Sequence, residues 1–123
     1  MNSRSDQLKP VFDLEERTLL FAKNVRLFLK TLPKNIINTE DGKQVIRSSG
    51  SVGANYIEAN EALSKKDFLM RLKICRKEAK ESNYWLKLLK EINQSSFNKN
   101  IQDLINESTE LMKIFSSIIE KSK

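Results

Sequence analysis

The chain has 123 residues, of which 39% are hydrophobic and 31% charged, a balance typical of a folded chain rather than a disordered or membrane-inserted one. It contains one Cys and no His, which excludes a His-containing catalytic triad, a His-ligated metal, a zinc knuckle and an internal disulfide. With 22 Lys and Arg against 16 Asp and Glu, the net charge is +6, which is compatible with polyanionic partners. Only 3 Gly and 2 Pro are present, too few for a sandwich or barrel of many short strands. The composition therefore predicts helices.

We expect residues 1–12 to form an N-terminal tail and residues 13–121 to form a single domain. The first ten residues are polar and of mixed charge, so they lack the apolar centre of a secretory signal. No apolar run approaches the roughly 18 to 20 residues that a bilayer-spanning helix needs. These features predict a cytoplasmic protein with no membrane partner.

A first helix is predicted from the N-cap Asp13 to about Thr31. Glu15 and Glu16 lie in its first turn, where the helix dipole favours negative charge, and Pro33 ends it. Its apolar stripe, at spacings of three and four, consists of Leu14, Leu20 or Phe21, Val25, Phe28 and Leu32.

A second helix is predicted from near Thr39 to about Ala62, with Glu40 and Asp41 in its first turn. Residues 48–54 are unusually small, and each Gly among them costs a helix about 1 kcal/mol relative to Ala. A sequence that accepts this cost is expected to gain close packing of another backbone. The apolar side of this helix consists of Val45, Val52, Tyr56 and Leu63.

A third helix, the longest, is predicted from the capping box of Ser64 and Asp67 to about Asn93. At about 100° per residue, its core-facing residues are Phe68, Leu72, Cys75, Ala79, Ser82, Leu86 and Leu89. A polar break precedes a fourth helix from about Asn98 to Lys121. The apolar stripe of that helix consists of Ile101, Leu104 or Ile105, Leu111 or Met112, Phe115 and Ile118 or Ile119.

Four amphipathic helices joined by short polar connectors can bury their stripes only against one another. Connectors of a few residues also force successive helices to run in opposite directions. The sequence therefore predicts an all-α fold, an antiparallel up-down four-helix bundle.

Five lysines align on the third helix, away from its core-facing side. They are Lys66, Lys73, Lys77, Lys80 and Lys87. This helix carries nine basic and four acidic residues, a surplus of five, whereas the rest of the chain is almost neutral. One interpretation is a solvated charged surface. The other is a surface that neutralises several phosphates of RNA or DNA at once.

A further apolar strip lies between the core-facing residues and the lysines of the third helix. It consists of Met70, Ile74, Trp85, Leu88 and Ile92. A contiguous apolar strip is typical of a subunit interface, so it predicts a homo-oligomer. The alternative is that a neighbouring helix of the same chain covers the strip.

The second helix has a polar face that consists of Arg47, Ser48, Ser51, Asn55 and Glu58. A functional interpretation is a cleft or an RNA contact, in which Arg47 binds phosphate. The structural alternative is a hydrogen-bonded network, in which Arg47 meets Glu58 or another carboxylate and the serines bond to backbone carbonyls. The small residues nearby favour the second alternative, because close packing leaves little room for a ligand.

Signatures of catalysis are missing from the sequence. No pair of carboxylates has the companions of a general acid and base, and no glycine-rich phosphate loop occurs. Cys75 falls on the core-facing side of the third helix, where we expect a buried, inert thiol. We therefore expect no enzyme activity, no catalytic or cofactor-binding residue, no metal and no small-molecule substrate.

Residues 44–59 and 66–89 resemble the four-helix-bundle family encoded by intervening sequences in 23S rRNA genes, which has often been mislabelled ribosomal. The family's pattern of Arg, spaced serines, Asn and Glu matches the polar face of the second helix. Its later Phe, Leu, Glu and Tyr-Trp-Leu positions match Phe68, Leu72, Glu81 and residues 84–86. The resemblance extends from about Phe12 to Asn93.

The resemblance implies a bacterial cytoplasmic protein that forms a ring-shaped homo-oligomer, a pentamer in relatives, with a basic surface and no known catalytic activity. A related branch is the accessory protein of diversity-generating retroelements, which associates with a reverse transcriptase and binds nucleic acid. The present sequence is more similar to the intervening-sequence branch. Two functions follow as alternatives: a module that binds RNA or DNA through the lysines of the third helix, and a scaffold for a protein partner.

Overall fold

The computed structural model describes residues 13–123, which form four α-helices and a short 3₁₀ helix. The α-helices are α2 (Leu14–Leu29), α3 (Ile36–Asn60), α4 (Lys65–Ile92) and α5 (Asn98–Ser122), and η1 (Ser95–Phe97) joins α4 to α5. The predicted tail, residues 1–12, lies outside the described residues.

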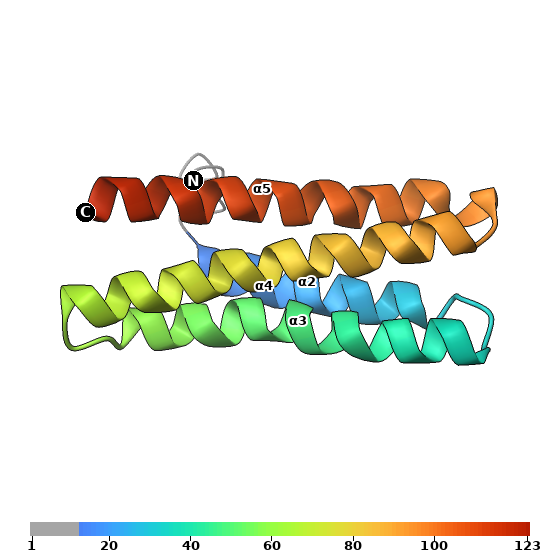
Figure 1. Ribbon diagram of the computed structural model, residues 1–123, viewed down its shortest axis with the longest axis horizontal. Helices are drawn as coiled ribbons and strands as arrows, with labels where there is room; N and C mark the ends of the chain where they lie inside the picture. Colours follow the sequence, from blue (N-terminus) through green and yellow to red (C-terminus); the bar gives the residue numbers. More distant parts are fainter. Residues whose placement is uncertain (1–12) are drawn as a thin grey trace, which may run out of the picture.

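Successive helices run in opposite directions and lie side by side (Figure 1). α3 packs on both α2 and α4, α4 packs on α5, and α2 contacts α5 to close the bundle. The α2–α3 pair and the α4–α5 pair therefore form opposite sides of the molecule. The predicted all-α, antiparallel up-down four-helix bundle is confirmed.

The core consists of one apolar stripe from each helix. On α4, six of the predicted core-facing residues are completely buried: Leu72, Cys75, Ala79, Ser82, Leu86 and Leu89. On α2 the core residue is Phe21, with 1% of its surface exposed, whereas Leu20 is 50% exposed. On α5 both Leu104 and Ile105 are buried. Periodicity thus identified the buried side of each helix, and packing selected among neighbouring positions.

The start of α3 differs from the prediction. α3 begins at Ile36, three residues earlier than expected, because Asn35 is its N-cap and the Asn35 Oδ1 accepts a hydrogen bond from the Asn38 N–H at 2.8 Å. Glu40 and Asp41 therefore do not lie in the first turn. The Asn cap fixed the start of the helix, so the position inferred from the acidic pair is wrong.

Leu63 was predicted to lie on the apolar side of this helix, and that prediction is wrong because its side chain is fully exposed. α3 ends at Asn60, so Leu63 lies in the connection to α4 and no longer continues the apolar side of the helix. The other members of that side are inside the bundle. Val45 and Val52 are fully buried, and Tyr56 is partly buried with its ring against the core.

The small residues of α3 allow α2 to approach closely. A Cβ added to Gly53 would lie 2.8 Å from the Thr18 Oγ1 of α2. The Thr18 hydroxyl is itself buried and donates a hydrogen bond to the Leu14 carbonyl oxygen at 2.7 Å. The predicted close backbone approach is therefore confirmed at Gly53.

Two adjacent residues of α4 make buried polar contacts with different helices. The Ser82 hydroxyl lies 2.7 Å from the Ser48 hydroxyl of α3. The Asn83 Nδ2 donates to the Ser108 Oγ of α5 at 2.9 Å. These contacts satisfy polar groups inside the bundle and fix the position of α4 relative to both of its neighbours.

Candidate nucleic-acid interface

All five lysines of the predicted basic stripe are exposed on α4. Within residues 13–123, none of them forms an ion pair with a carboxylate. These lysines are Lys66, Lys73, Lys77, Lys80 and Lys87. Their charges are therefore not neutralised by the part of the chain that the structure describes.

Three of these lysines border a groove between α4 and α5, which we call the α4–α5 groove. Its volume is about 860 Å³. It is lined by Lys73, Arg76, Lys77 and Lys80 of α4 and by Met112, Lys113, Ser116, Ser117 and Glu120 of α5. Five cationic side chains from two helices thus surround one concave surface.

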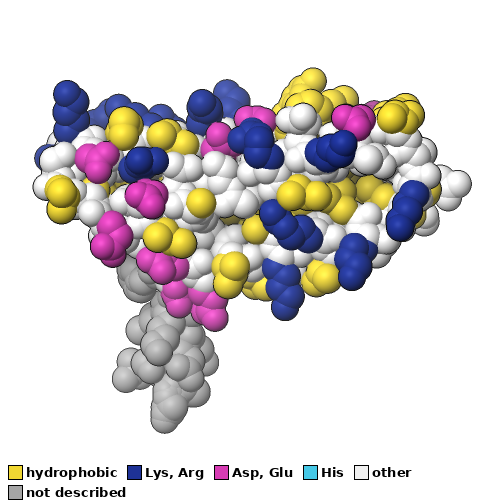
Figure 2. Space-filling view, turned by 90° about the horizontal axis from the view of Figure 1, so that it is seen from below, with side chains coloured by type: hydrophobic (Ala, Val, Ile, Leu, Met, Phe, Trp, Pro, Cys, Tyr) yellow, Lys and Arg dark blue, Asp and Glu magenta, His cyan; other side chains and the backbone are white. Residues whose placement is uncertain are grey.

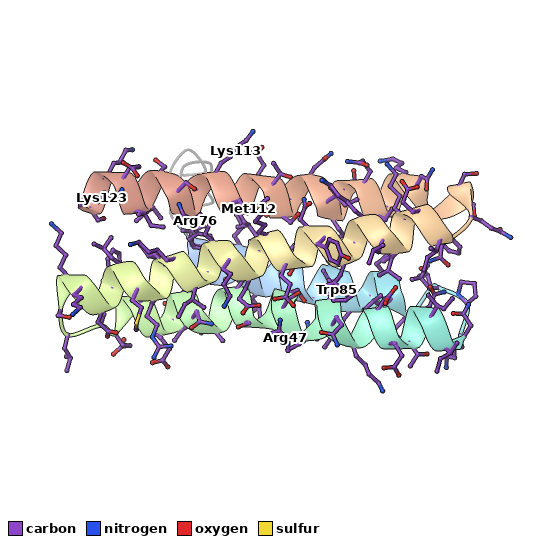
Figure 3. The ribbon with its side chains drawn as sticks, viewed as in Figure 1. Arg47, Arg76, Trp85, Met112, Lys113 and Lys123 are labelled. Carbon is purple, nitrogen blue, oxygen red and sulfur yellow. The ribbon has the colours of Figure 1, made fainter. Side chains whose placement is uncertain are left out.

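Arg76 lies between the two helices, close to Met112 (Figure 3). Its Nη1 donates a hydrogen bond to the Ser116 Oγ at 3.3 Å, which connects α4 to α5 inside the groove. A guanidinium group carries five N–H donors in a planar fork. Arg76 therefore keeps donors that suit the oxygens of a phosphate group.

Glu120 is the only carboxylate among the described residues that line the α4–α5 groove. Lys123 donates a hydrogen bond to it at 2.9 Å, and this contact holds the pKa of Glu120 below its usual value. The negative charge of Glu120 is thus matched by a cation that does not line the groove. The net charge of the groove is strongly positive.

The remaining lysines of the stripe lie outside this groove. Lys66 lines a neighbouring hollow of about 480 Å³, which shares Lys73 with the groove, and Lys87 lines neither. Arg76 and Lys113 also line the groove but are not among the predicted lysines. Arg76 lies three residues after Lys73, so helical spacing alone would have found it, whereas Lys113 enters the groove only through the packing of α5.

The spacing of the groove cations suits a chain of phosphates. Lys73, Lys77 and Lys80 follow one another at about 6 and 4.5 Å along the axis of α4. The lining residues include no aromatic side chain on which a base could stack. The groove therefore offers charge and hydrogen bonds to a nucleic-acid backbone and little means of reading a base.

Arg47, on the polar face of α3, pairs with α4. Its Nη2 lies 3.2 Å from a Glu78 oxygen and also contacts Glu81. The hydrogen bond from Arg47 lowers the pKa of Glu81. Trp85 Nε1 donates to the same Glu81 carboxylate at 3.3 Å. Arg47 thus meets carboxylates of the neighbouring helix and not Glu58.

The rest of the polar face does not converge on a pocket. The Asn55 Nδ2 donates to the Ser51 carbonyl oxygen at 2.9 Å, and the Asn55 Oδ1 accepts from Arg71 of α4 at 3.1 Å. Ser48 is buried, as described above, and Glu58 is exposed. Arg47 and Asn55 therefore contact different residues of α4, and, among the described residues, no side-chain hydrogen bond or ion pair joins either of them to Glu58.

The predicted apolar strip of α4 is exposed at its ends and covered in its middle. Met70 and Ile92 are 47% and 48% exposed. Ile74, Trp85 and Leu88 are half-buried, and the Trp85 ring packs against the core. Most of the other exposed large apolar side chains among the described residues lie on α2 and α3, whereas Tyr84 lies on α4 and Leu63 in the connection between α3 and α4.

Cys75 is buried as predicted, and burial raises the pKa of its thiol to about 12. Within residues 13–123, no three side chains of His, Cys, Asp or Glu are grouped so as to hold a metal ion. In the same range, every helix is too short or too polar to cross a membrane.

Comparison with curated proteins finds no match to this chain. The solved structure of a protein of unknown function from the S23 ribosomal protein family of Bacteroides thetaiotaomicron is similar, with a TM-score of 0.70 and 35% identity. The alignment covers 85% of this chain and 96% of that one. The family model of the 23S rRNA-intervening sequence protein matches residues 12–117, which include α2, α3, α4 and most of α5. The chain therefore belongs to the 23S rRNA-intervening sequence protein family.

Proposed function

We propose that the chain is a non-enzymatic, homo-oligomeric bundle protein of the bacterial cytoplasm that binds the phosphate backbone of RNA or DNA through the α4–α5 groove. The observation that carries this proposal is the groove itself, where five cations meet one carboxylate, Glu120, which also pairs with Lys123. The family's link to 23S rRNA genes, contained in its name, is consistent with a nucleic-acid partner. A ring of copies, a pentamer by the resemblance, would present several such grooves together.

The cations of the groove determine how the affinity for nucleic acid should depend on salt concentration and on base sequence. Contacts to phosphate release counterions, so affinity falls as salt rises, with a slope of roughly −0.9 per phosphate neutralised on a duplex and −0.7 on a single strand. Engagement of all five cations corresponds to a slope of roughly −3.5 to −4.5. Because the groove offers little base readout, affinities for different sequences of the same form should be similar.

Filter binding across a salt series tests the proposal. The wild-type chain should bind RNA or DNA at about 50 mM salt and lose affinity steeply towards 200 mM. A variant with Lys73→Gln, Lys77→Gln and Lys80→Gln should bind every sequence more weakly, and its salt slope should be smaller by roughly two to three. Negligible binding at 50 mM salt, or a flat slope, would rule the proposal out.

A matched control separates the groove from net charge. Lys23, Lys34 and Lys121 are exposed, form no ion pair within the described residues and do not line the α4–α5 groove. Replacing these three by Gln removes the same charge and should change affinity much less than the groove variant. Equal losses in the two variants would mean that overall charge, and not the groove, attracts the nucleic acid.

A second candidate function is a scaffold for a protein partner, without a direct role in nucleic-acid binding. Two exposed apolar residues of α3, Ile46 and Ile57, favour it, because each lines a hollow beside α2 and a solvated surface does not need them. Pull-down from native lysate with and without nuclease distinguishes the two functions. A partner that is retained after nuclease treatment supports the scaffold, and a partner that is lost supports binding through nucleic acid.

A further inference from the structure

An aromatic side chain, Tyr84, lies on the same side of α4 as the lysines of the basic stripe. Successive intervals of four, three, four and three residues separate Lys73, Lys77, Lys80, Tyr84 and Lys87, so these residues form one row along the helix. The first three line the α4–α5 groove, and Tyr84 follows about 6 Å beyond Lys80 along the helix axis. The row of cations therefore leads from the groove to an aromatic ring.

More than half of the Tyr84 side chain is in contact with solvent. Its exposed fraction is 57%, and no other aromatic residue among residues 13–123 is exposed. The remaining Phe and Tyr rings of this range, and Trp85, are buried or half-buried in the bundle. The core therefore leaves the larger part of the Tyr84 ring available to another molecule.

The Tyr84 ring rests against the ring of Trp85. The two ring centroids are 5.2 Å apart and the ring planes are inclined by 76°, so the edge of one ring meets the face of the other. Trp85 is itself fixed, because its ring packs against the core and its Nε1 donates a hydrogen bond to Glu81. An edge-to-face contact covers at most one face of Tyr84. The ring is thus oriented in advance and keeps a face on which a planar group can stack.

Positive charge surrounds Tyr84 on this side of the helix. Lys80 precedes it by four residues and Lys87 follows it by three, and neither forms an ion pair within the described part of the chain. Of the nearby carboxylates, Glu81 pairs with Arg47, and Glu91 lies seven residues further along the helix. In Figure 2, hydrophobic side chains protrude from the upper edge of the molecule, where α4 lies, with Lys and Arg side chains beside them. A polyanion is therefore attracted to the place where the ring is exposed.

We propose that Tyr84 stacks on an unpaired base, so that the ligand of the α4–α5 groove is a single-stranded segment of nucleic acid. This inference rests on the proposed function, because the groove has to hold the phosphates of the strand that reaches the ring. A basic groove that follows the backbone, combined with an aromatic side chain that stacks on a base, is suited to binding single strands without sequence preference. Inside a duplex each base is already paired and stacked, so it offers no face to Tyr84.

Stacking and charge have separable effects on affinity. Contacts between lysines and phosphates release counterions and so determine the salt slope, whereas stacking on Tyr84 releases none. Loss of one stacked base lowers affinity by a factor of roughly five or more. A variant that lacks the ring should therefore bind more weakly at every salt concentration and keep the salt slope of wild type. The loss should be similar for different bases, because every base has a π-face.

Two substitutions of Tyr84 test the proposal by filter binding. The probes are oligouridylate and oligothymidylate of about 15 nucleotides, which distinguish RNA from DNA, and a duplex of the same length. Tyr84→Leu removes the aromatic ring and keeps an apolar side chain that favours a helix. It should bind the preferred single strand at least fivefold more weakly, with an unchanged salt slope, and bind the duplex as wild type does. Tyr84→Phe keeps the ring and should bind all probes as wild type does.

A fluorescent base reports the contact directly. One 2-aminopurine within the single strand loses fluorescence when it stacks on an aromatic ring. Scanning its position along the strand should locate a site that wild type and Tyr84→Phe quench and Tyr84→Leu does not. Circular dichroism and light scattering should give all three chains the same helix content and the same mass.

The outcomes separate this inference from the proposed function. If replacing Lys73, Lys77 and Lys80 by Gln weakens binding and Tyr84→Leu does not, the groove binds phosphate and the stacking role is overturned. Equal losses of Tyr84→Leu on single strand and duplex, or a Tyr84→Phe variant as weak as Tyr84→Leu, also overturn it. A changed mass in Tyr84→Leu would assign the ring to a contact between copies and overturn it as well. Failure of wild type to bind any probe removes both proposals.

Discussion

Asn38 and Asn93, 55 positions apart, exchange hydrogen bonds through their side-chain amides. The Asn38 Nδ2 donates to the Asn93 Oδ1 at 3.0 Å, and the Asn93 Nδ2 donates to the Asn38 Oδ1 at 2.9 Å. Each amide also donates to a backbone carbonyl, that of Pro33 for Asn38 and that of Leu89 for Asn93. The pair therefore joins the first turn of α3 to the end of α4.

Replacing either member should leave the amide of the other without its partner. Asn38→Ala and Asn93→Ala should each lower the free energy of unfolding by roughly 1 to 3 kcal/mol, because Asn38 is buried. The double variant should lose less than the sum of the two single losses, since one interaction cannot be removed twice. Urea unfolding of the four chains measures the coupling. Strictly additive losses would show that the reciprocal contact adds no stability of its own.

Gly53 should tolerate no larger residue, because a Cβ there would lie 2.8 Å from the Thr18 Oγ1. Gly53→Ala should therefore lower the free energy of unfolding by roughly 1 to 3 kcal/mol, despite the higher helix propensity of Ala. Gly42→Ala is the matched control within the same helix. Its Cβ would meet Leu29 at 3.6 Å, an ordinary contact, so it should stabilise the fold by about 0.4 to 1 kcal/mol. Thermal unfolding of both variants would show opposite shifts.

The Arg47–Glu81 contact should make stability depend on pH. Arg47 lowers the pKa of Glu81 in the folded chain from the ordinary value of 4.5. A depressed folded-state pKa contributes stability above the unfolded value, and that stability is lost as pH falls through the lower folded value. The contribution is therefore fully present at neutral pH, begins to decline near pH 4.5 and is gone below the folded-state pKa of Glu81.

Arg47→Gln tests this dependence. The variant should be less stable than wild type at pH 7, and the difference should shrink as pH falls through the lowered pKa of Glu81 and that carboxylate becomes protonated. Denaturant unfolding between pH 7 and pH 3 would show the two curves converging. A difference that stays constant over this range would assign the effect of Arg47 to packing alone.

Lys113 should belong to the same binding surface as the lysines of α4, because it lines the α4–α5 groove from the opposite helix. Lys113→Gln should reduce the salt slope of nucleic-acid binding by roughly 0.7 to 0.9. Lys121, also exposed on α5, does not line the groove, so Lys121→Gln should leave the slope close to that of wild type. Identical slopes for the two variants would confine the contact to α4.

Cys75 should react slowly with thiol reagents. Its side chain is buried, and burial raises the pKa of the thiol to about 12, so the thiolate is scarce at pH 8. Labelling with a disulfide reagent should be slow in buffer and rapid in denaturant. Rapid labelling of the native protein would show that the α4 core opens readily.

The fold was predictable from the sequence because helical periodicity marks buried positions directly. Leu72, Leu86 and Leu89 are examples, since their angular positions alone assigned them to the core. The errors arose where a helix ends. The cap at Asn35 moved the start of α3, and the end of α3 at Asn60 left Leu63 in solvent. Local hydrogen bonds determine where a helix begins and ends, and the hydrophobic pattern does not reveal those hydrogen bonds.

The candidate site was only half predictable. The lysines of α4 share one side of a single helix, so spacing revealed them, whereas Lys113 joins them only when α5 is packed alongside. The sequence likewise left undetermined which carboxylate pairs with Arg47. Periodicity places Arg47 on a face of α3 and does not say which carboxylate of α4 will lie opposite. To predict such contacts, one must know how far one helix is shifted along its neighbour.

The contacts of Ser82 and Asn83 have a mechanical consequence for α4. Because these adjacent residues bond to α3 and α5 respectively, sliding α4 by one turn, about 5.4 Å, would strand buried polar groups on both sides. α4 therefore cannot slide along its own axis relative to α3 and α5. The helix keeps its position, so the spacing of Lys73, Lys77 and Lys80 along the groove should not change when an anion is bound.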